Sequence, residues 1–387
     1  MAERALAHVE KIEWIRPIEG ADNIELIGVL GWVCIAKKGE FNVGDMAVYI
    51  EIDSKCPETD ERFAFLANKK FKVKTMKLGK FKVISQGLAL PLSLFPELQD
   101  RNIGDDVTEA LKITYASEED ATRKTNKVDP NAKYKSMAKR RPKLFANPIV
   151  RRIMRYSIGR KIMFLLFGRK KDNPKKFPDW IVKTDETRIE NAPFYLHSTE
   201  KWIKTEKCDG TSCTFAVDRL KKGKNKFDFI VCSRNVRQAD REQACYHESN
   251  IYWELADKYD IEKILTQFAT ENDYNRVVLQ GEGIGSVQGN PYKFTENKLF
   301  VFNLIIDGTR LGTIEMADFC KSHGLISVPI IDTAYELPKT MEEMKLEADG
   351  YSELNPKVKR EGFVYRDISG QKSFKNVSRE YLLKKGE

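Results

Sequence analysis

Short runs in which apolar and polar residues alternate dominate the first part of the chain. Turn signals such as Lys38-Gly39 separate these runs, and a period of two is typical of strands that bury one face. Short strands with glycine between them predict a small OB-like β-barrel over residues 1–118. Such a barrel could bind nucleic acid or serve only as a scaffold. The expected strands are His8–Ile15, Ile24–Leu30, Trp32–Ala36, Ala47–Ile52 and Phe71–Ile84.

The pattern changes twice after this barrel. Residues 119–179 begin without a clear period and then contain Pro148–Gly168, where helical spacing separates apolar residues from arginines and predicts one amphipathic helix. From residue 180 to residue 387 strands dominate again, with helices expected at Tyr246–Asn272 and Ile314–Gly324. We therefore predict the α+β class, with a barrel, a basic connector and an antiparallel α+β domain.

Positive charge is concentrated in the connector. The 387-residue chain carries a net charge of +9, but Arg123–Lys176 contains 19 Lys and Arg against two Asp, a local net of +17. Such a segment attracts a polyanion through counterion release, which favours RNA as its partner. A solvated linker and a contact with anionic lipid are the alternatives.

Cysteine usage and hydropathy bear on the compartment. The seven cysteines show neither a disulfide framework nor zinc-ligand spacing, and no apolar segment follows Met1-Ala-Glu-Arg4. The longest apolar run, Ile162–Phe167, is too short to span a bilayer. We expect a soluble intracellular protein, cytoplasmic or nuclear, that acts as a monomer.

The candidate nucleophile is Lys207, in the sequence Lys207-Cys208-Asp209-Gly210. Alone, this tetrapeptide is a weak signal, because many such lysines lie in solvated turns. An attacking amine must lose its proton, and burial beside Trp202 and Phe215 would lower the pKa of Lys207. A bound metal, with Arg234 or Lys375, would lower it further.

Acidic residues with glycine neighbours follow at strand positions. Glu282 ends the run Val277–Glu282, and Glu361 begins Glu361–Tyr365. Together with Asp209 they suit a hydrated hard cation, Mg²⁺ or Mn²⁺, held largely through its waters. The alternative is that these glutamates merely face water at strand ends.

Three further residues could contact a nucleotide. Phe302 is the candidate for stacking on a base, although Phe300 shares its face and either ring could simply pack in a core. Arg234 could reach a ribose or phosphate oxygen, and Lys375 could neutralise an α-phosphate as charge develops. Each of these cations could equally be a solvated surface residue.

The ordered set resembles the ATP-dependent RNA ligases of the covalent lysyl-nucleotidyltransferase superfamily. Besides the residues above, Lys183–Asn191 and the N-terminal barrel resemble the fifth RNA ligase family. The resemblance implies that Lys207 is adenylylated and that Arg188 meets the nucleotide phosphates. The last motif of these enzymes often has two lysines one residue apart. Here Ser373 and Val377 flank Lys375 at that spacing, so Lys372 is the candidate second lysine.

The resemblance implies that the protein joins RNA 3′-OH and 5′-phosphate ends through a lysyl-AMP and an RNA-adenylate, in RNA repair. ATP and Mg²⁺ or Mn²⁺ would be its cofactors. DNA ligases and mRNA capping enzymes are disfavoured because their OB domain follows the nucleotidyltransferase domain. From a different class, the alternative is a non-catalytic protein that binds structured RNA.

Overall fold

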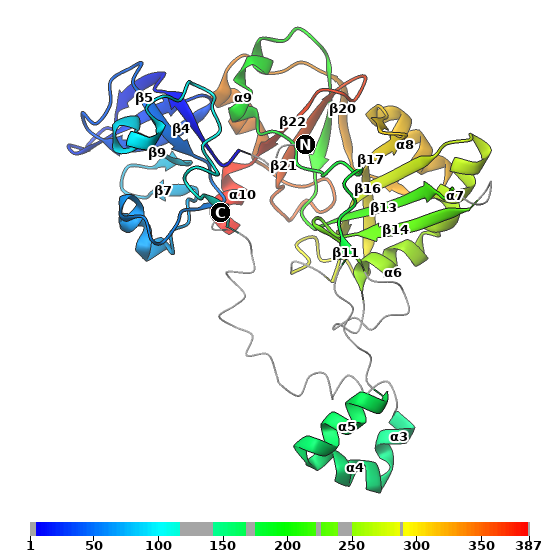
Figure 1. The fold of residues 1–387 in the computed structure, drawn as a ribbon. Helices are drawn as coiled ribbons and strands as arrows, with labels where there is room; N and C mark the ends of the chain where they lie inside the picture. The colour runs from blue at the N-terminus through cyan, green and yellow to red at the C-terminus, as the bar shows by residue number, and fades with distance from the viewer. Residues whose placement is uncertain are drawn as a thin grey trace.

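The computed structural model describes residues 5–116, 142–167, 175–221, 226–238, 250–286 and 289–385. Its N-terminal part is built from two three-stranded antiparallel sheets, with orders β1-β5-β9 and β2-β3-β4, and two short strand pairs, β10-β6 and β7-β8 (Figure 1). The strands are β1 (Ala7–Lys11), β2 (Trp14–Pro17), β3 (Ile24–Val29), β4 (Trp32–Lys37), β5 (Met46–Ile50), β6 (Ser54–Lys55), β7 (Met76–Leu78), β8 (Val83–Ser85), β9 (Leu88–Pro91) and β10 (Thr114–Tyr115).

The C-terminal part contains two further sheets. Strand order is β11-β15-β14-β13-β16-β17-β18 in the larger, where β19 also pairs with β17, and β20-β12-β21-β22 in the smaller. Neighbours are antiparallel except for β17 and β19. The strands are β11 (Lys175–Lys176), β12 (Trp202–Lys207), β13 (Thr211–Arg219), β14 (Phe227–Cys232), β15 (Val236–Arg237), β16 (Arg276–Ile284), β17 (Lys298–Ile306), β18 (Thr309–Arg310), β19 (Ile326–Ser327), β20 (Ile330–Tyr335), β21 (Gly362–Asp367) and β22 (Ser373–Val377).

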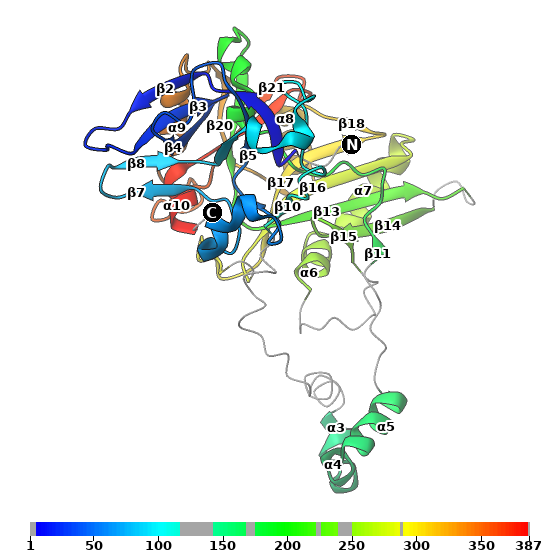
Figure 2. The ribbon, with the colours of Figure 1, turned by 60° about the vertical axis from the view of Figure 1, so that its left-hand side comes forward.

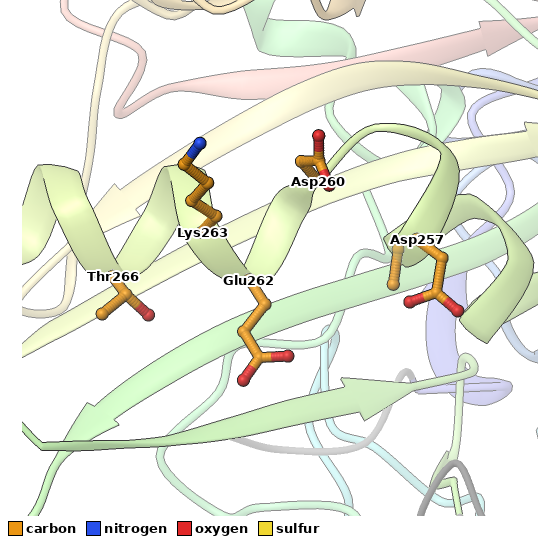
Figure 3. A pocket seen from close by; sticks show the side chains of 6 residues that line it. Asp257, Asp260, Glu262, Lys263 and Thr266 are labelled. Carbon is orange, nitrogen blue, oxygen red and sulfur yellow. The ribbon is translucent and has the colours of Figure 1, made fainter.

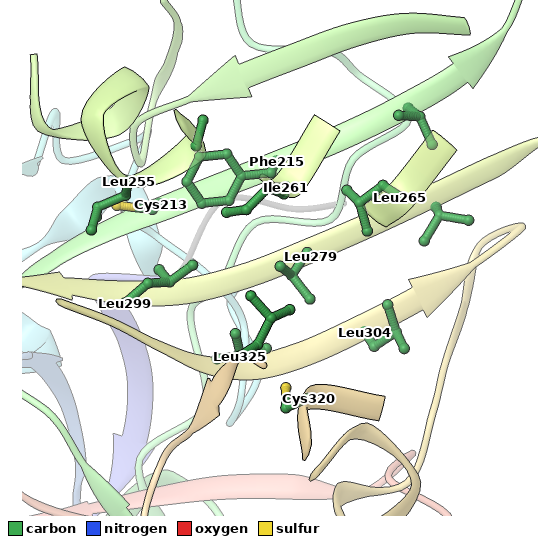
Figure 4. Packing of buried hydrophobic residues seen from close by; sticks show 14 of the residues in the cluster. Cys213, Phe215, Leu255, Ile261, Leu265, Leu279, Leu299, Leu304, Cys320 and Leu325 are labelled. Carbon is green, nitrogen blue, oxygen red and sulfur yellow. The ribbon is translucent and has the colours of Figure 1, made fainter. Parts of the chain in front are cut away.

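Helices α6 (Ile251–Lys258), α7 (Ile261–Glu271) and α8 (Thr313–Ser322) cover one face of the larger sheet. Figure 4 shows how their apolar residues meet those of the strands, with Leu255 and Leu265 packed near Phe215 and Leu279. Alternation along the strands and helical spacing along α6–α8 therefore bury one common core. The predicted class, a barrel followed by an antiparallel α+β part, is confirmed.

Four expected elements are interrupted. The strand expected over His8–Ile15 is divided into β1 and β2, which belong to different sheets. The helix expected over Tyr246–Asn272 is divided into α6 and α7 at Asp260, whose φ of 50° is left-handed, and its first residues lie outside the described ranges. The connector helix is likewise divided, at Tyr156. The strand expected over Phe71–Ile84 consists of β7 and β8, joined by a turn that contains Lys82 with a φ of 55°. All four differences lie where the backbone leaves its regular conformation for a few residues.

The connector helices are α3 (Pro142–Ala146), α4 (Pro148–Arg155) and α5 (Ser157–Phe167), which pack on one another (Figure 1). Arg151, Arg152 and Arg155 are exposed, as predicted. Apolar side chains expected to face a core are exposed as well, among them Ile158 at 70% and Leu165 at 82%. No helix in the described ranges has both the length and the hydropathy needed to cross a bilayer.

Two helices link the barrel with the C-terminal part, α9 (Met341–Ala348) and α10 (Arg379–Lys385). Tyr381 and Leu382 of α10 belong to the same buried cluster as Trp32 and Tyr49 of the barrel. Both Figure 1 and Figure 2 show α10 beside the barrel. On α9, the buried Lys345 pairs with Glu190. The barrel is therefore packed firmly against the C-terminal part.

Candidate active site

Three strands bring Lys207, Glu282 and Glu361 together. Lys207 ends β12 and lies opposite Gly362, the residue after Glu361, while Glu282 lies on β16 opposite Ser212 of β13. The Lys207 Nζ atom is 2.7 Å from Glu361 Oε1. Residues from distant parts of the sequence thus form one charged cluster between the two C-terminal sheets.

Gly210, between β12 and β13, allows the chain after Lys207 to lie close to β16. A Cβ at this position would lie 2.5 Å from the Gly283 carbonyl oxygen, which no side chain tolerates. The backbone N–H of Gly210 also donates to the Glu282 carboxylate. The Asp-Gly pair is therefore a packed junction between strands and not a solvated turn.

Asp209 is held from two sides. Its side chain is 8% exposed, and its backbone N–H donates to the Tyr292 hydroxyl oxygen at 2.9 Å. The ammonium of Lys385, at the end of α10, lies 2.9 Å from Asp209 Oδ2. No local pattern of residues associates Lys385 with this site.

Mutual charge shifts the pKa values of the cluster. Burial alone would lower the pKa of Lys207, but the carboxylates of Glu361 and Glu282 outweigh it and raise that pKa above its ordinary value. Burial, reinforced by the neighbouring acids, raises the pKa of Glu282 to about 8. Burial raises the pKa of Glu361 too, against the opposing effect of Lys207.

Burial acts on the pKa of Lys207 in the predicted direction, but in the protein alone the acidic residues reverse the net shift. Trp202 and Phe215 are fully buried, but they pack in two core clusters that do not contain the Lys207 motif. The prediction did not weigh the acidic residues, which favour the ammonium form at short range. Lys207 therefore requires an additional positive charge in the site before its amine is free.

The acidic set suits a hydrated divalent cation better than a directly coordinated one. Within the described ranges, no group of three His, Cys, Asp or Glu side chains forms a direct metal-binding cluster. Asp209, Glu282 and Glu361 lie near the ammonium groups of Lys207 and Lys385, and the charge of Lys375 also acts on Glu361. A cation that keeps most of its waters, such as Mg²⁺, fits this arrangement.

Arg234 and Lys375 converge on Asp185, a residue that precedes the expected phosphate contact Arg188. Lys375 Nζ lies 2.6 Å from Asp185 Oδ1, and Arg234 Nη2 lies 3.5 Å from Oδ2. The backbone N–H of Lys375 also donates to the Thr187 carbonyl at 2.8 Å. The segment around Asp185 thus runs beside β22 and brings two candidate phosphate contacts together.

Arg188 is buried between the barrel and this segment. Its Nη2 donates to Asp53 of the barrel at 3.0 Å, while Nε and Nη1 are buried with no hydrogen-bond partner in the described part of the chain. Buried guanidinium donors are normally satisfied, so these two nitrogens suit an anionic ligand such as a phosphate. The geometry is compatible with a phosphate contact and adds a link to the barrel.

Phe302 and Phe300 differ in exposure. Phe300 is 5% exposed and stacks on Phe294, with ring centroids 5.9 Å apart. Phe302 is only partly buried against the cluster that contains Cys208. Of the two rings, Phe302 therefore retains the accessible surface that a stacked base needs.

Lys372 does not join the cluster. It forms an ion pair with Glu200, at 2.6 Å, in which both side chains are about half exposed. The structure thus leaves Lys375 as the cation of the last motif that faces the candidate site. Lys372 has a surface role instead.

A separate hollow of about 480 Å³ lies along α6 and α7. It is lined by Ala256, Asp257, Asp260, Glu262, Lys263 and Thr266, and none of the candidate residues takes part (Figure 3). Its walls are helix surfaces with side chains that point to solvent. We assign no chemistry to it.

Comparisons with known proteins match both parts of the chain. A family model for RNA ligase matches residues 200–384, and one for an OB-fold domain matches residues 6–92. Comparison with curated proteins gives no match. Among solved structures, the Naegleria gruberi RNA ligase with pyrophosphate is 30% identical over 99% of both chains, with a TM-score of 0.74.

The chain belongs to the RNA ligase family. Variants of the Naegleria enzyme are similar to the same degree. One with ATP and manganese is 30% identical over 98% of both chains, with a TM-score of 0.74. One with AMP and manganese is 30% identical, covers 98% of this chain and 99% of that chain, and has a TM-score of 0.75. This RNA ligase is therefore an enzyme in which an OB-fold domain precedes the ligase domain.

Proposed function

We propose that this RNA ligase uses ATP to join a 3′-OH to a 5′-phosphate, with Lys207 as its nucleophile. The observation that carries the proposal is the placement of Lys207 among three carboxylates, with Lys375, Arg234 and the two unsatisfied nitrogens of Arg188 as candidate phosphate contacts. A non-catalytic RNA-binding protein would have no need for such a costly concentration of buried charge.

In the first step, Lys207 Nζ gives up a proton to solvent and attacks the α-phosphorus of ATP. A P–N bond forms, the bond to the β-phosphate oxygen breaks, and pyrophosphate leaves. A divalent cation near the carboxylates would offset the negative charge that keeps Lys207 protonated and would stabilise the phosphate charge. Lys375 is placed to neutralise the α-phosphate, and Phe302 to stack on the adenine.

In the later steps, the oxygen of an RNA 5′-phosphate displaces Lys207 from the adenylate and gives an RNA-adenylate. A 3′-hydroxyl then attacks that activated phosphate, forms the phosphodiester and releases AMP. The proton of the hydroxyl leaves in the same step. We further propose membership of the fifth RNA ligase family and a role in RNA repair.

The proposal extends to the organisation of the chain. We assign residues 1–118 to the barrel, 119–179 to an RNA-attracting connector and 180–387 to catalysis, in a protein that acts as a monomer. All six cysteines in the described ranges are free and buried, which supports a reducing intracellular compartment, cytoplasmic or nuclear.

Incubation with α-labelled ATP and magnesium tests the proposal. The protein should acquire covalent label, and Lys207→Ala should acquire none. Lys201→Ala is the matched control, because Lys201 lies just before β12 and pairs with Glu336 at the surface. Unlabelled wild-type protein, or label that persists in Lys207→Ala, would overturn the mechanism.

A further inference from the structure

Helix α10 ends beside the candidate active site. The Lys385 ammonium lies 2.9 Å from Asp209 Oδ2 and donates a hydrogen bond to Oδ1 at 3.3 Å. The Lys385 side chain is 31% exposed, whereas that of Asp209 is 8% exposed. The lysine therefore reaches in from the rim to a carboxylate that is almost fully buried.

The position of Lys385 is determined by the barrel. Tyr381 and Leu382, on the same short helix, are buried in the barrel cluster with Trp32. The start of the helix is fixed as well, because the Ser378 hydroxyl donates to Asp349 Oδ1 at 2.6 Å. One helix thus packs in the barrel core and contacts the motif that contains Lys207.

The contact restricts Asp209, the one acid of the cluster that belongs to the lysine motif. The Tyr292 hydroxyl fixes the backbone of Asp209, and Lys385 fixes its carboxylate. Ion pairs with a buried partner are strong when the second group adds hydrogen bonds, and they select one rotamer. Without Lys385, the carboxylate would lose its direct ion pair and would keep only its longer-range attraction to Lys207, so it would be free to turn.

The geometry points to Lys385 as a positioning residue for catalysis. It holds the Asp209 carboxylate in the orientation that receives the hydrated cation accompanying ATP. Helix α10 thereby makes the docked barrel part of the active site. This inference rests on the proposed function, since it assigns Lys385 to the same site.

The test uses the full-length protein and single-turnover labelling with α-labelled ATP over a range of magnesium concentrations. Lys385→Ala should slow adenylylation about tenfold, as expected when a charged hydrogen bond is removed, and should require more magnesium for half-maximal rate. Lys385→Arg should restore most of the rate. Lys384→Ala is the matched control, because Lys384 is the exposed neighbour on the same helix and has no place in the site.

A double-mutant cycle with Asp209→Asn tests whether Lys385 acts on the rate through Asp209 or independently of it. If Lys385 acts through Asp209, Lys385→Ala should have little further effect in the Asp209→Asn background. If the two substitutions lowered the adenylylation rate by independent factors that multiply in the double variant, the inference would be overturned. Unchanged labelling in Lys385→Ala would overturn it too, as would a loss of rate that follows a large loss of Tm and is not restored by arginine.

Binding provides a readout without the covalent step. Calorimetry with Mn²⁺ and α,β-methylene-ATP should show several-fold weaker binding to Lys385→Ala and none of this weakening in Lys384→Ala. Equal binding by wild type and Lys385→Ala would contradict the positioning role. If wild-type protein itself takes no label from ATP, the proposed function fails, which is distinguishable from failure of the Lys385 role alone.

Discussion

The cluster around Lys207 and the connector helices α4 and α5 are both rich in charge, but they place it differently. In the cluster, opposite charges lie 2.7 Å apart in the Lys207–Glu361 pair and are largely buried, so neighbouring groups shift the pKa values of Lys207 and Glu282. On the helices, Arg151, Arg152 and Arg155 are exposed, where water and salt screen them. Buried charge can change reactivity, whereas exposed charge acts mainly by attracting a partner.

Removing the acids should have the largest effect on chemistry. Asp209→Ala, Glu282→Ala and Glu361→Ala should each lower the rate of adenylylation by about 10²–10³-fold, because each contributes to the field that holds the cation. Tm should change little, since the acids repel one another. The control is Glu296→Ala, an exposed glutamate paired with Lys258. Rates that fell only in proportion to Tm would show that these acids are structural.

Arg188 is a buried cation with both paired and unpaired donors. One of its nitrogens pairs with Asp53 of the barrel, and two lack hydrogen-bond partners in the described part of the chain. Arg188→Ala should slow adenylylation by about tenfold if those two nitrogens bind phosphate. Asp53→Asn removes the same ion pair but leaves the guanidinium in place, so its labelling rate should stay near that of wild type. Equal losses in both variants would assign Arg188 to barrel docking alone.

The pH dependence of stability should reveal the buried acids. The pKa of Glu282 is raised from 4.5 to about 8 in the folded protein, so folding favours its protonated form. The resulting stabilisation is complete below about pH 4.5 and is lost as pH rises through about 8. Without divalent cations, wild type should therefore lose on the order of a few kcal/mol of stability from this group over that interval.

Glu282→Gln should flatten this dependence, because the amide does not titrate. Urea midpoints at pH 6 and pH 8.5, measured with a chelator present, provide the comparison. In Glu282→Gln, Glu361 should still cause a smaller pH dependence of stability, because burial raises the pKa of Glu361 as well. Parallel pH profiles for wild type and Glu282→Gln would refute the assignment.

The connector should have the smallest effect on chemistry and a clear effect on RNA. Replacing Arg151, Arg152 and Arg155 with alanine should weaken RNA binding and flatten the slope of log affinity against log salt. Each phosphate that is no longer neutralised should reduce that slope by roughly 0.7 to 0.9. Lysine adenylylation should be unchanged. Lys139, Arg140 and Arg141, a second triple for the same experiment, lie outside the described residues.

Lys263→Ala with Lys321→Ala, on the helices of the catalytic part, provides a charge-removal control. Unchanged RNA affinity and salt slope in the arginine triple variant would exclude RNA as the partner of α4. Binding to anionic vesicles would then be the next measurement, because Ile158 and Leu165 expose apolar surface beside the arginines.

Local patterns predicted the strands of the barrel well where the chain runs straight. The expected Ile24–Leu30 and Trp32–Ala36 differ by one residue from β3 and β4. Prediction failed where the backbone reverses, near Lys82 and at Asp260, because apolar periodicity was given more weight than the turn signals of Gly79 and Asp260.

The candidate site also contains residues that local motifs predicted and residues that they did not. Lys207, Glu282 and Glu361 were found because each lies within a short motif, and the structure brings them together. Asp185 and Lys385 were missed, because their importance depends on contacts across the fold that no local pattern encodes. Asp185 lies three residues before Arg188, so the acidic character of that segment was the one available signal.

Tyr381 and Leu382 belong to α10 but pack in the barrel core. This packing affects how the protein can be divided into fragments. A fragment limited to residues 5–116 would lack these side chains and would expose the apolar surface they cover, including part of Trp32. Such a fragment should aggregate or fold poorly when expressed alone. Supplying a peptide that spans Val377–Lys385 should improve its solubility, as expected for two pieces of one cooperative folding unit.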